Sequence, residues 1–230
     1  MNKISIIIPI LNEVDAIHRL LLHIENSISN KIDSEIIIVD AGSTDGSQME
    51  VLKHPKTILI SSEKGRAIQM NTGSKIATGS FLYFLQCDSF PPKKFDLLIL
   101  EQIQKGNLAG CFRMKFDYTH PVLLVAQWFT KVNHISCRGG DQSLYISQKL
   151  FIEIGGYDEK YSIYEDNEIC KRLYKGKQFK VIPNYLITSA RRYRENGVWQ
   201  LQYHFAVIHL KRRLGYSIET MLDYYKRKIQ

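Results

Sequence analysis

Two observations predict an α/β protein with a mostly parallel central sheet that is flanked by helices. Short, continuously apolar runs are typical of strands buried on both faces, and they lie at 4–9, 36–39, 57–60 and 81–85. Segments of helical periodicity separate these runs, most clearly where one face gathers Ile17, Leu20, Leu21, Ile24 and Ile28. Strands that alternate with helices form parallel sheets, because each crossover helix packs back onto the sheet.

The second half of the chain continues with shorter elements. Strands are predicted at 108–114, 143–146 and 179–182, and Pro183 should end the last of them. Helices are predicted at 95–104, 122–132, 149–154 and 165–174, with an extended segment at 187–192. Two amphipathic helices follow, at about 195–213 and 217–228. We expect a single domain with a helical C-terminal appendage.

The composition limits the classes of protein that need to be considered. Hydrophobic residues make up 44% of the 230 residues, which is enough for a sizeable core. No segment approaches the roughly 20 apolar residues that cross a bilayer, and the broken run at 4–10 lacks the features of a signal peptide. The four cysteines are scattered without a C-x-x-C pair, as in proteins of a reducing cytosol. We therefore expect a cytoplasmic protein, or one at the inner face of the membrane.

The basic charge is concentrated near the C-terminus. The net charge is +8, and residues 171–230 carry 14 Lys or Arg against 3 Asp or Glu. Such a region suggests an anionic partner, which could be a phosphate-bearing ligand, lipid headgroups or nucleic acid. A solvated basic face is the alternative. The sequence has no helix-turn-helix, zinc or aromatic RNA-binding signature, so we expect no nucleic-acid partner.

Two aspartates end predicted strands. Asp88 follows the run 81–85, and Asp40 follows the run 36–39. Ligands of open parallel sheets bind outside the carboxyl ends of the strands, so Asp88 could hold a metal or a sugar hydroxyl and Asp40 a base or ribose. A helix cap or a turn is the alternative for either aspartate. The turn after the first strand lacks both G-x-G-x-x-G and G-x-x-x-x-G-K-[ST], which disfavours a dinucleotide dehydrogenase and a P-loop NTPase.

Six segments resemble, in order, the motifs of family 2 glycosyltransferases. Residues 7–13 (IIPILNE) and 38–47 (IVDAGSTDGS) look like the opening motifs of the family. Residues 65–71 (GRAIQMN) are similar to a segment of one bacterial branch. The same branch is matched by Gly155–Asp158 (GGYD), Tyr164–Asp166 (YED) and Ser189–Arg192 (SARR).

The resemblance implies a GT-A fold with a nucleotide-binding half at about 1–90, an acceptor and catalytic half at about 91–194, and the appendage at about 195–230. It implies transfer of a sugar from a nucleoside diphosphate to an acceptor hydroxyl, with inversion at the anomeric carbon. A divalent cation, Mn²⁺ or Mg²⁺, would assist at the diphosphate. The residues expected around the nucleoside are Pro9, Asn12, Glu13 and Asp40, with Arg66 near the base or diphosphate.

The resemblance also assigns the metal ligand and the catalytic base. Asp88 occupies the last position of the family's D-x-D motif, but Gln86 replaces the first aspartate. One carboxylate with phosphates and waters can still hold a hard cation. Asp166, with Glu165 beside it, matches the base that would take the acceptor proton. An acid pair that caps a helix is the alternative for these two residues.

Two further pairs complete the expected site. Arg191 and Arg192 could offset the charge of the leaving diphosphate, although an exposed basic loop is the alternative. Asp141 and Gln142 lie where residues that bind acceptor or donor-sugar hydroxyls are expected. A nucleotidyltransferase and a non-catalytic nucleotide-sugar-binding relative remain alternative functions.

The C-terminal helices carry basic residues at 211–213 and 226–228 beside apolar stripes. The predicted stripe of the first helix consists of Val198, Leu201, Phe205 and Ile208. This pattern could bring the chain to a membrane that holds a lipid-linked acceptor. The stripes could equally pack on the core or on a second subunit of a homodimer.

Overall fold

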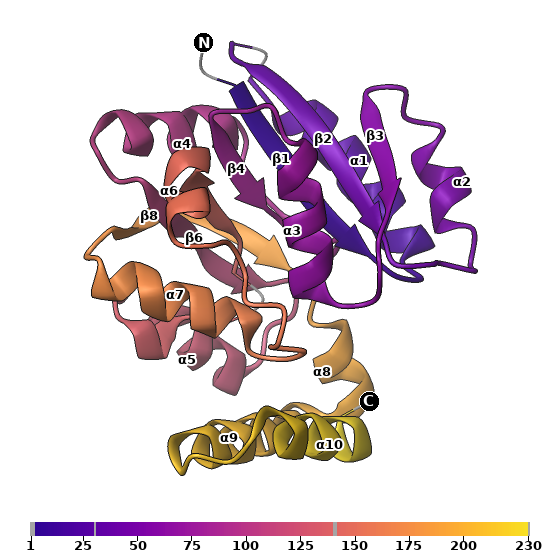
Figure 1. Ribbon diagram of the computed structural model, residues 1–230. Coiled ribbons are helices and arrows are strands. Elements are labelled where there is room, and N and C mark those ends of the chain that lie inside the picture. The colour runs from indigo at the N-terminus through magenta and orange to yellow at the C-terminus, as the bar shows by residue number, and fades with distance from the viewer. Residues whose placement is uncertain (1–2, 30, 140–141, 230) are drawn as a thin grey trace.

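The computed structural model describes residues 3–29, 31–139 and 142–229. Its centre is an eight-stranded sheet with the strand order β3-β2-β1-β4-β7-β6-β8-β5 (Figure 1). The first four strands are mutually parallel: β1 (Lys3–Ile10), β2 (Asp33–Asp40), β3 (Thr57–Ser61) and β4 (Phe81–Phe84). The predicted α/β class with a mostly parallel sheet is therefore confirmed.

The other four strands form the second half of the sheet, namely β5 (Ser89–Phe90), β6 (Ala109–Phe116), β7 (Leu144–Ser147) and β8 (Phe179–Thr188). The prediction that Pro183 ends a strand was wrong. The register against β6 shifts between Phe112, which pairs with Ile182, and Arg113, which pairs with Tyr185. Pro183 thus lies in a bulge, where its missing N–H removes no ladder hydrogen bond, and β8 continues beyond it.

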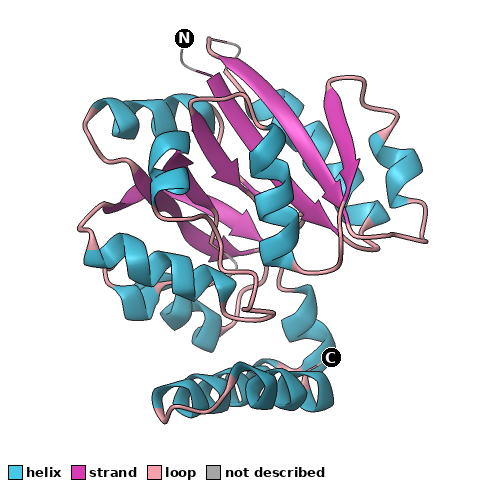
Figure 2. Ribbon diagram, in the orientation of Figure 1, coloured by secondary structure: helices cyan, strands magenta, loops and turns pink. Residues whose placement is uncertain are grey.

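Helices cover both faces of the sheet (Figures 1 and 2). One face carries α1 (Val14–Ser27), α2 (Ser47–Val51) and α4 (Phe95–Gln104), and the other carries α3 (Arg66–Ile76), α6 (Gln148–Glu153) and α7 (Glu165–Lys175). The isoleucines of β1 alternate between the two cores: Ile6 and Ile8 pack with α1, and Ile7 packs with α3. Burying each such side chain contributes about 1.5–3 kcal/mol, and β1 lies inside the sheet, between β2 and β4.

A third apolar cluster lies below the carboxyl ends of the strands, where α9 and α10 run side by side (Figure 1). It joins α5 (Pro121–Phe129), α8 (Arg191–Asn196), α9 (Val198–Arg213) and α10 (Ile218–Lys228); a 3₁₀ turn, η1, spans Ile135–Cys137. Leu201 and Ile208 of the predicted stripe are buried in this cluster, so that stripe packs on the protein itself. Among the described residues, no helix is both long and apolar enough to span a membrane.

The start of this C-terminal region differs from the prediction. Residues 187–192 are not one extended segment, because β8 ends at Thr188 and Arg191 begins α8. The predicted helix at 195–213 is divided between α8 and α9 at Gly197, whose φ of 79° is unfavourable for other residues. Both arginines of the SARR segment therefore project from a short helix.

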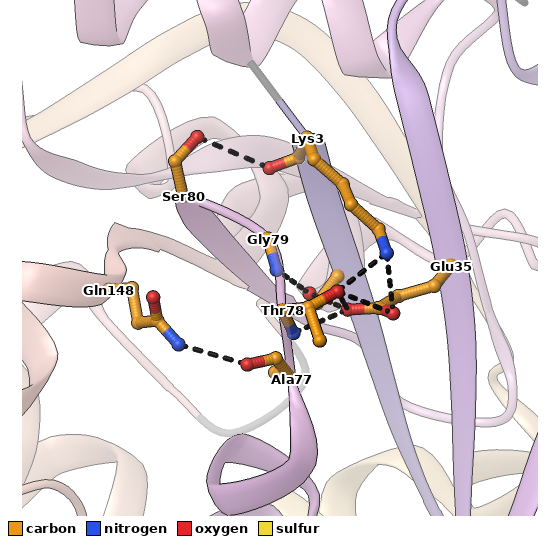
Figure 3. Close-up of polar contacts among 8 residues, drawn as sticks. Lys3, Glu35, Ala77, Thr78, Gly79, Ser80 and Gln148 are labelled. Carbon is orange, nitrogen blue, oxygen red and sulfur yellow. Dashed lines mark hydrogen bonds and ion pairs between the residues drawn. The ribbon is translucent and has the colours of Figure 1, made fainter. Parts of the chain in front are cut away.

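The amino ends of the strands are joined by a polar cluster around Glu35 (Figure 3). Lys3 Nζ donates to Glu35 Oε2 at 2.8 Å, Ser5 Oγ donates to Oε1 at 2.5 Å, and the Thr78 backbone N–H donates to Oε1 at 2.7 Å. Burial raises the pKa of Glu35, but these hydrogen bonds outweigh it and lower the pKa to about 2. The charged cluster fixes the turn before β4 against β1 and β2, at the edge opposite the predicted site.

Candidate active site

The predicted site begins at the carboxyl edge of the parallel strands. In the sheet register Ile10 of β1 lies beside Asp40 of β2, and Ile7 of β1 lies beside Phe84 of β4. The turns that follow these three strands therefore meet at one edge. This edge is where open parallel sheets bind their ligands.

Asp40 shapes the turn after β2. Its side chain is almost wholly buried and accepts hydrogen bonds from the backbone N–H groups of Gly42 and Ser43 at 3.1 Å, and from Gln48 Nε2 at 2.6 Å. Ser43 Oγ also donates to it. Burial raises the pKa of Asp40, but the hydrogen bonds outweigh burial and lower it. Asp40 is thus held as a carboxylate, and it fixes the loop expected to surround a nucleoside.

The turns after β1 and β2 are hydrogen-bonded to each other. Asn12, at a φ of 55°, accepts from the Thr44 N–H through Oδ1 at 2.8 Å. The Glu13 N–H donates to Ser47 Oγ at 2.9 Å, which satisfies a free donor at the start of α1. Pro9 lies within β1, beside Val39 of β2. The turns expected to hold the nucleoside therefore form one unit.

A charged group lies around Asp88. The Ser189 N–H donates to the Asp88 carbonyl at 3.1 Å, and this contact extends the pairing of β5 with β8. Arg191 forms an ion pair with Glu13 at 3.2 Å. Hydrogen bonding and the charge of Glu13, with a further contribution from Asp88, raise the pKa of Arg191. Two carboxylates and a guanidinium thus meet where a metal and a diphosphate are expected.

Cys87 lies beside Asp88 as a buried thiol. Burial raises the pKa of its thiol well above the ordinary value, and the charges of Glu13 and Asp88 raise it further. The thiol therefore stays neutral.

A second charged group lies at the start of α7. Arg66, the first residue of α3, lies 3.2 Å from Glu165 Oε1 through Nε and donates to Asp166 Oδ2 through a terminal nitrogen at 2.9 Å. Glu165 is buried, and Asp166 is mostly buried. The guanidinium and the N-terminal end of α7 both lie next to the Asp166 carboxylate. Arg66 thus lies against the predicted base, and α7 begins at the same edge as the turns above.

Two other predicted residues, Arg192 and Gln142, make contacts outside these groups. Arg192 donates to the Tyr225 hydroxyl at 2.5 Å and stacks on the Tyr225 ring, so it joins α8 to α10. Gln142 is buried, and its Nε2 donates to the Cys137 carbonyl at 3.3 Å. Asp141 lies outside the described residues. The structure therefore gathers Glu13, Asp88 and Arg191 in one group, and Arg66, Glu165 and Asp166 in another.

Sequence reasoning missed two amides in the GRAIQMN segment. Gln69 is buried, and its Nε2 donates to the carbonyls of Ile10 and Val39 at 2.9 and 2.8 Å, which joins the ends of β1 and β2. Asn71 accepts from the Tyr157 N–H at 3.0 Å and donates to the Tyr157 carbonyl at 2.8 Å. Their position in the segment could have predicted these contacts. Polar residues on a helix that packs on a sheet need buried hydrogen-bond partners.

The chain is similar to known glycosyltransferases. The profile of Glycosyl transferase family 2 matches residues 5–155. Poly(ribitol-phosphate) beta-N-acetylglucosaminyltransferase TarP of Staphylococcus aureus is 31% identical over 94 residues, which are 38% of this chain and 29% of TarP. Glycosyltransferase AglE of Haloferax volcanii is 32% identical over 99 residues, which are 40% of this chain and 32% of AglE. In these alignments the chain spans about a third of either relative's length.

Solved structures share the fold. TarS 1-349 of S. aureus in complex with UDP superposes with a TM-score of 0.69 at 20% identity, over 86% of this chain and 64% of that one. The mannosyltransferase PcManGT of Pyrobaculum calidifontis, in complex with GDP-Man and Mn²⁺, superposes with a TM-score of 0.65 at 18% identity. The superposition covers 89% of this chain and 61% of PcManGT. These likenesses confirm the predicted GT-A fold. Since the family profile covers more than half of the chain, the chain belongs to glycosyl transferase family 2.

Proposed function

We propose that this chain transfers a sugar from a nucleoside diphosphate to an acceptor hydroxyl, with inversion at the anomeric carbon. The observation that carries the proposal is the pairing of Arg66 with Asp166 at the edge of the sheet that also holds Asp88. The likeness to structures that hold UDP, and GDP-Man with Mn²⁺, supports a nucleotide-sugar donor. A hydroxyl acceptor fits a carboxylate base.

The donor would lie across the turns after β1, β2 and β4. The joined turns at 11–13 and 41–46 would hold the nucleoside, and Asp88 would hold a divalent cation together with diphosphate oxygens and waters. The cation would neutralise charge on the diphosphate. Arg191 would leave its exposed pairing with Glu13 and donate to the phosphate oxygens as negative charge develops on them.

Asp166 would act on the acceptor. Its carboxylate takes the proton of the acceptor hydroxyl while the oxygen attacks the anomeric carbon on the side opposite the diphosphate. A new carbon–oxygen bond forms, the bond to the diphosphate breaks, and the proton stays on Asp166. Arg66 holds the carboxylate in position through its hydrogen bond to Oδ2.

A thermal-shift panel of nucleoside diphosphates and nucleotide-sugars, each with and without Mn²⁺, tests the donor site. A ligand at 100 times its dissociation constant stabilises by about 2.7 kcal/mol, which raises the Tm of a chain of this size by about 5–10 °C. We expect one uridine or guanosine compound to give such a shift. Asp88→Ala should keep the ligand-free Tm and lose the part of the shift that needs Mn²⁺. The absence of a shift with every compound would contradict the proposed function.

We further propose that the acceptor is reached at an anionic membrane surface. The stripe predicted for α9 is buried, but the opposite side of α9 exposes large apolar residues. One of them is Trp199, which is 72% exposed. Its ring contacts His120 at the start of α5. Trp128 of α5 is also exposed. Aromatic side chains together with the cations at 211–213 suit the interface of anionic lipids.

Vesicle co-sedimentation tests this surface. The chain should bind vesicles that contain anionic lipid and not neutral ones, and the double variant Trp128→Ser and Trp199→Ser should lose most of the binding. Ile152→Ser is the matched control, because Ile152 is as exposed as the tryptophans but lies on α6. Equal failure to bind both kinds of vesicle would contradict the membrane contact and leave the donor site untouched.

A further inference from the structure

A second cluster of ligand-type side chains lies on the outer helices α1 and α2. His18 of α1, Glu50 of α2 and His54, which follows α2, each offer one ligand atom, and the three atoms lie within 4.8 Å of one another. Imidazole nitrogens with one carboxylate are typical ligands of Zn²⁺ and similar ions. We propose that these three residues bind a divalent transition-metal ion, with water in the remaining position.

Local structure holds the ligands in place before an ion arrives. Val51 is fully buried and fixes α2 against the sheet. Thr57 donates to the His54 carbonyl through its backbone N–H at 3.0 Å and through Oγ1 at 2.7 Å, which fixes the backbone of the loop after α2. The His54 side chain is only 9% exposed. Two of the three ligands therefore lie on backbone that the fold already orders.

His54 contacts a carboxylate through one ring nitrogen. Its Nδ1 lies 3.2 Å from Oε1 of Glu25, which lies two turns after His18 on the same face of α1. Metal-binding histidines commonly donate their other ring N–H to a carboxylate, which orients the ring and raises its basicity. This contact leaves Nε2 of His54 as the ligand atom.

The charge and access of the cluster also suit a cation. Lys53 Nζ donates to Glu50 Oε2 and His18 Nδ1 donates to Glu50 Oε1, both at 2.6 Å, so the carboxylate already faces two cationic or imidazole groups. The Lys53 ammonium would compete with an ion, but its side chain is 68% exposed and can turn into solvent. A shallow hollow reaches the cluster from solvent and is lined by Val14, Asp15, His18, Arg19, Glu50 and Lys53.

A bound ion would join α2 to α1. These helices follow the two turns that the Glu13–Ser47 hydrogen bond connects. The site is separate from Asp88, which follows β4, so the two can be tested independently.

Titration of the chelator-stripped chain with ZnCl₂, followed by calorimetry, tests the proposal. We expect one ion per chain, and a visible absorption spectrum typical of tetrahedral Co²⁺ when CoCl₂ is used instead. His54→Gln should weaken Zn²⁺ binding at least tenfold, and Glu25→Gln should weaken it by about 10–100-fold. Lys53→Met should bind Zn²⁺ more tightly than the unchanged chain, a gain that a purely structural cluster would not produce.

Two control variants distinguish this site from the other histidines and carboxylates of the chain. His23→Gln changes a histidine on the same helix whose Nε2 contacts the Pro91 carbonyl, and it should bind Zn²⁺ normally. Asp88→Ala should also keep full binding. His18 is 50% exposed, so His18→Gln should fold and lose binding even if His54→Gln does not fold. Unchanged affinity in His18→Gln, or binding lost only in Asp88→Ala, would overturn the proposal.

Discussion

Asp166→Asn is expected to lower the rate of sugar transfer by about 10²–10⁴-fold, the usual contribution of a positioned general base. An asparagine keeps the shape of the side chain, and its amide oxygen can still accept from Arg66, so the start of α7 should keep its structure. It cannot take the proton of the acceptor hydroxyl. The rate is measured as release of nucleoside diphosphate from the donor that gives the largest thermal shift.

The matched control for this variant is Glu168→Gln. Glu168 is another acid in the first turn of α7, but it pairs with Arg172 at 2.5 Å instead of Arg66. We expect this variant to transfer within a few-fold of the unchanged chain. Transfer by Asp166→Asn at the original rate would assign the base to another group. Loss of the donor's thermal shift would instead place Asp166 in the donor site.

Contacts between motifs join the two halves of the chain. Two of the three motifs of the first half contact motifs of the second half. Asn71 of the GRAIQMN segment clamps the backbone of Tyr157, and Arg66 of the same segment pairs with Asp166. The Asp88 carbonyl accepts from Ser189 of the SARR segment. The two halves of the site are thus held together by the residues that carried the resemblance.

The local elements could be predicted because their causes are local. Continuous apolar runs report burial on both faces, and this placed β1, β2, β3 and β4 within a few residues. The carboxyl ends of parallel strands always lie at the same edge of a sheet. The location of Asp40 and Asp88 at one edge could therefore be predicted from the same apolar runs.

The contacts that could not be predicted depend on distant partners. Arg66 and Asp166 are separated by 100 positions, and no spacing rule relates them. Arg192 contacts Tyr225 because the chain turns at Gly197 and returns as α10. The strand β8 continues past Pro183 because its register against β6 shifts there. The sequence of β8 alone does not determine this register.

Gly110→Ala, which adds one methyl group inside the sheet, is expected to lower the stability of the protein strongly. Gly110 of β6 lies between Tyr145 of β7 and Lys180 of β8. A Cβ at this position would lie 1.9 Å from the Lys180 carbonyl oxygen and 2.7 Å from the Tyr145 ring. The backbone oxygen cannot move away unless the β6–β8 ladder opens. We expect a loss of more than about 3 kcal/mol in the free energy of unfolding, of a total of about 5–15 kcal/mol.

The loss is measured by urea unfolding, and it corresponds to a Tm lower by about 6–12 °C. Gly139→Ala is the control, because a Cβ there meets nothing within 4 Å and the backbone is not in the left-handed region. We expect its stability to change by less than about 0.5 kcal/mol. Adding Tyr145→Phe to Gly110→Ala should not restore stability, because the nearest obstacle is the Lys180 carbonyl. Full recovery in that double variant would show that the Tyr145 hydroxyl, rather than the ladder backbone, requires a glycine at position 110.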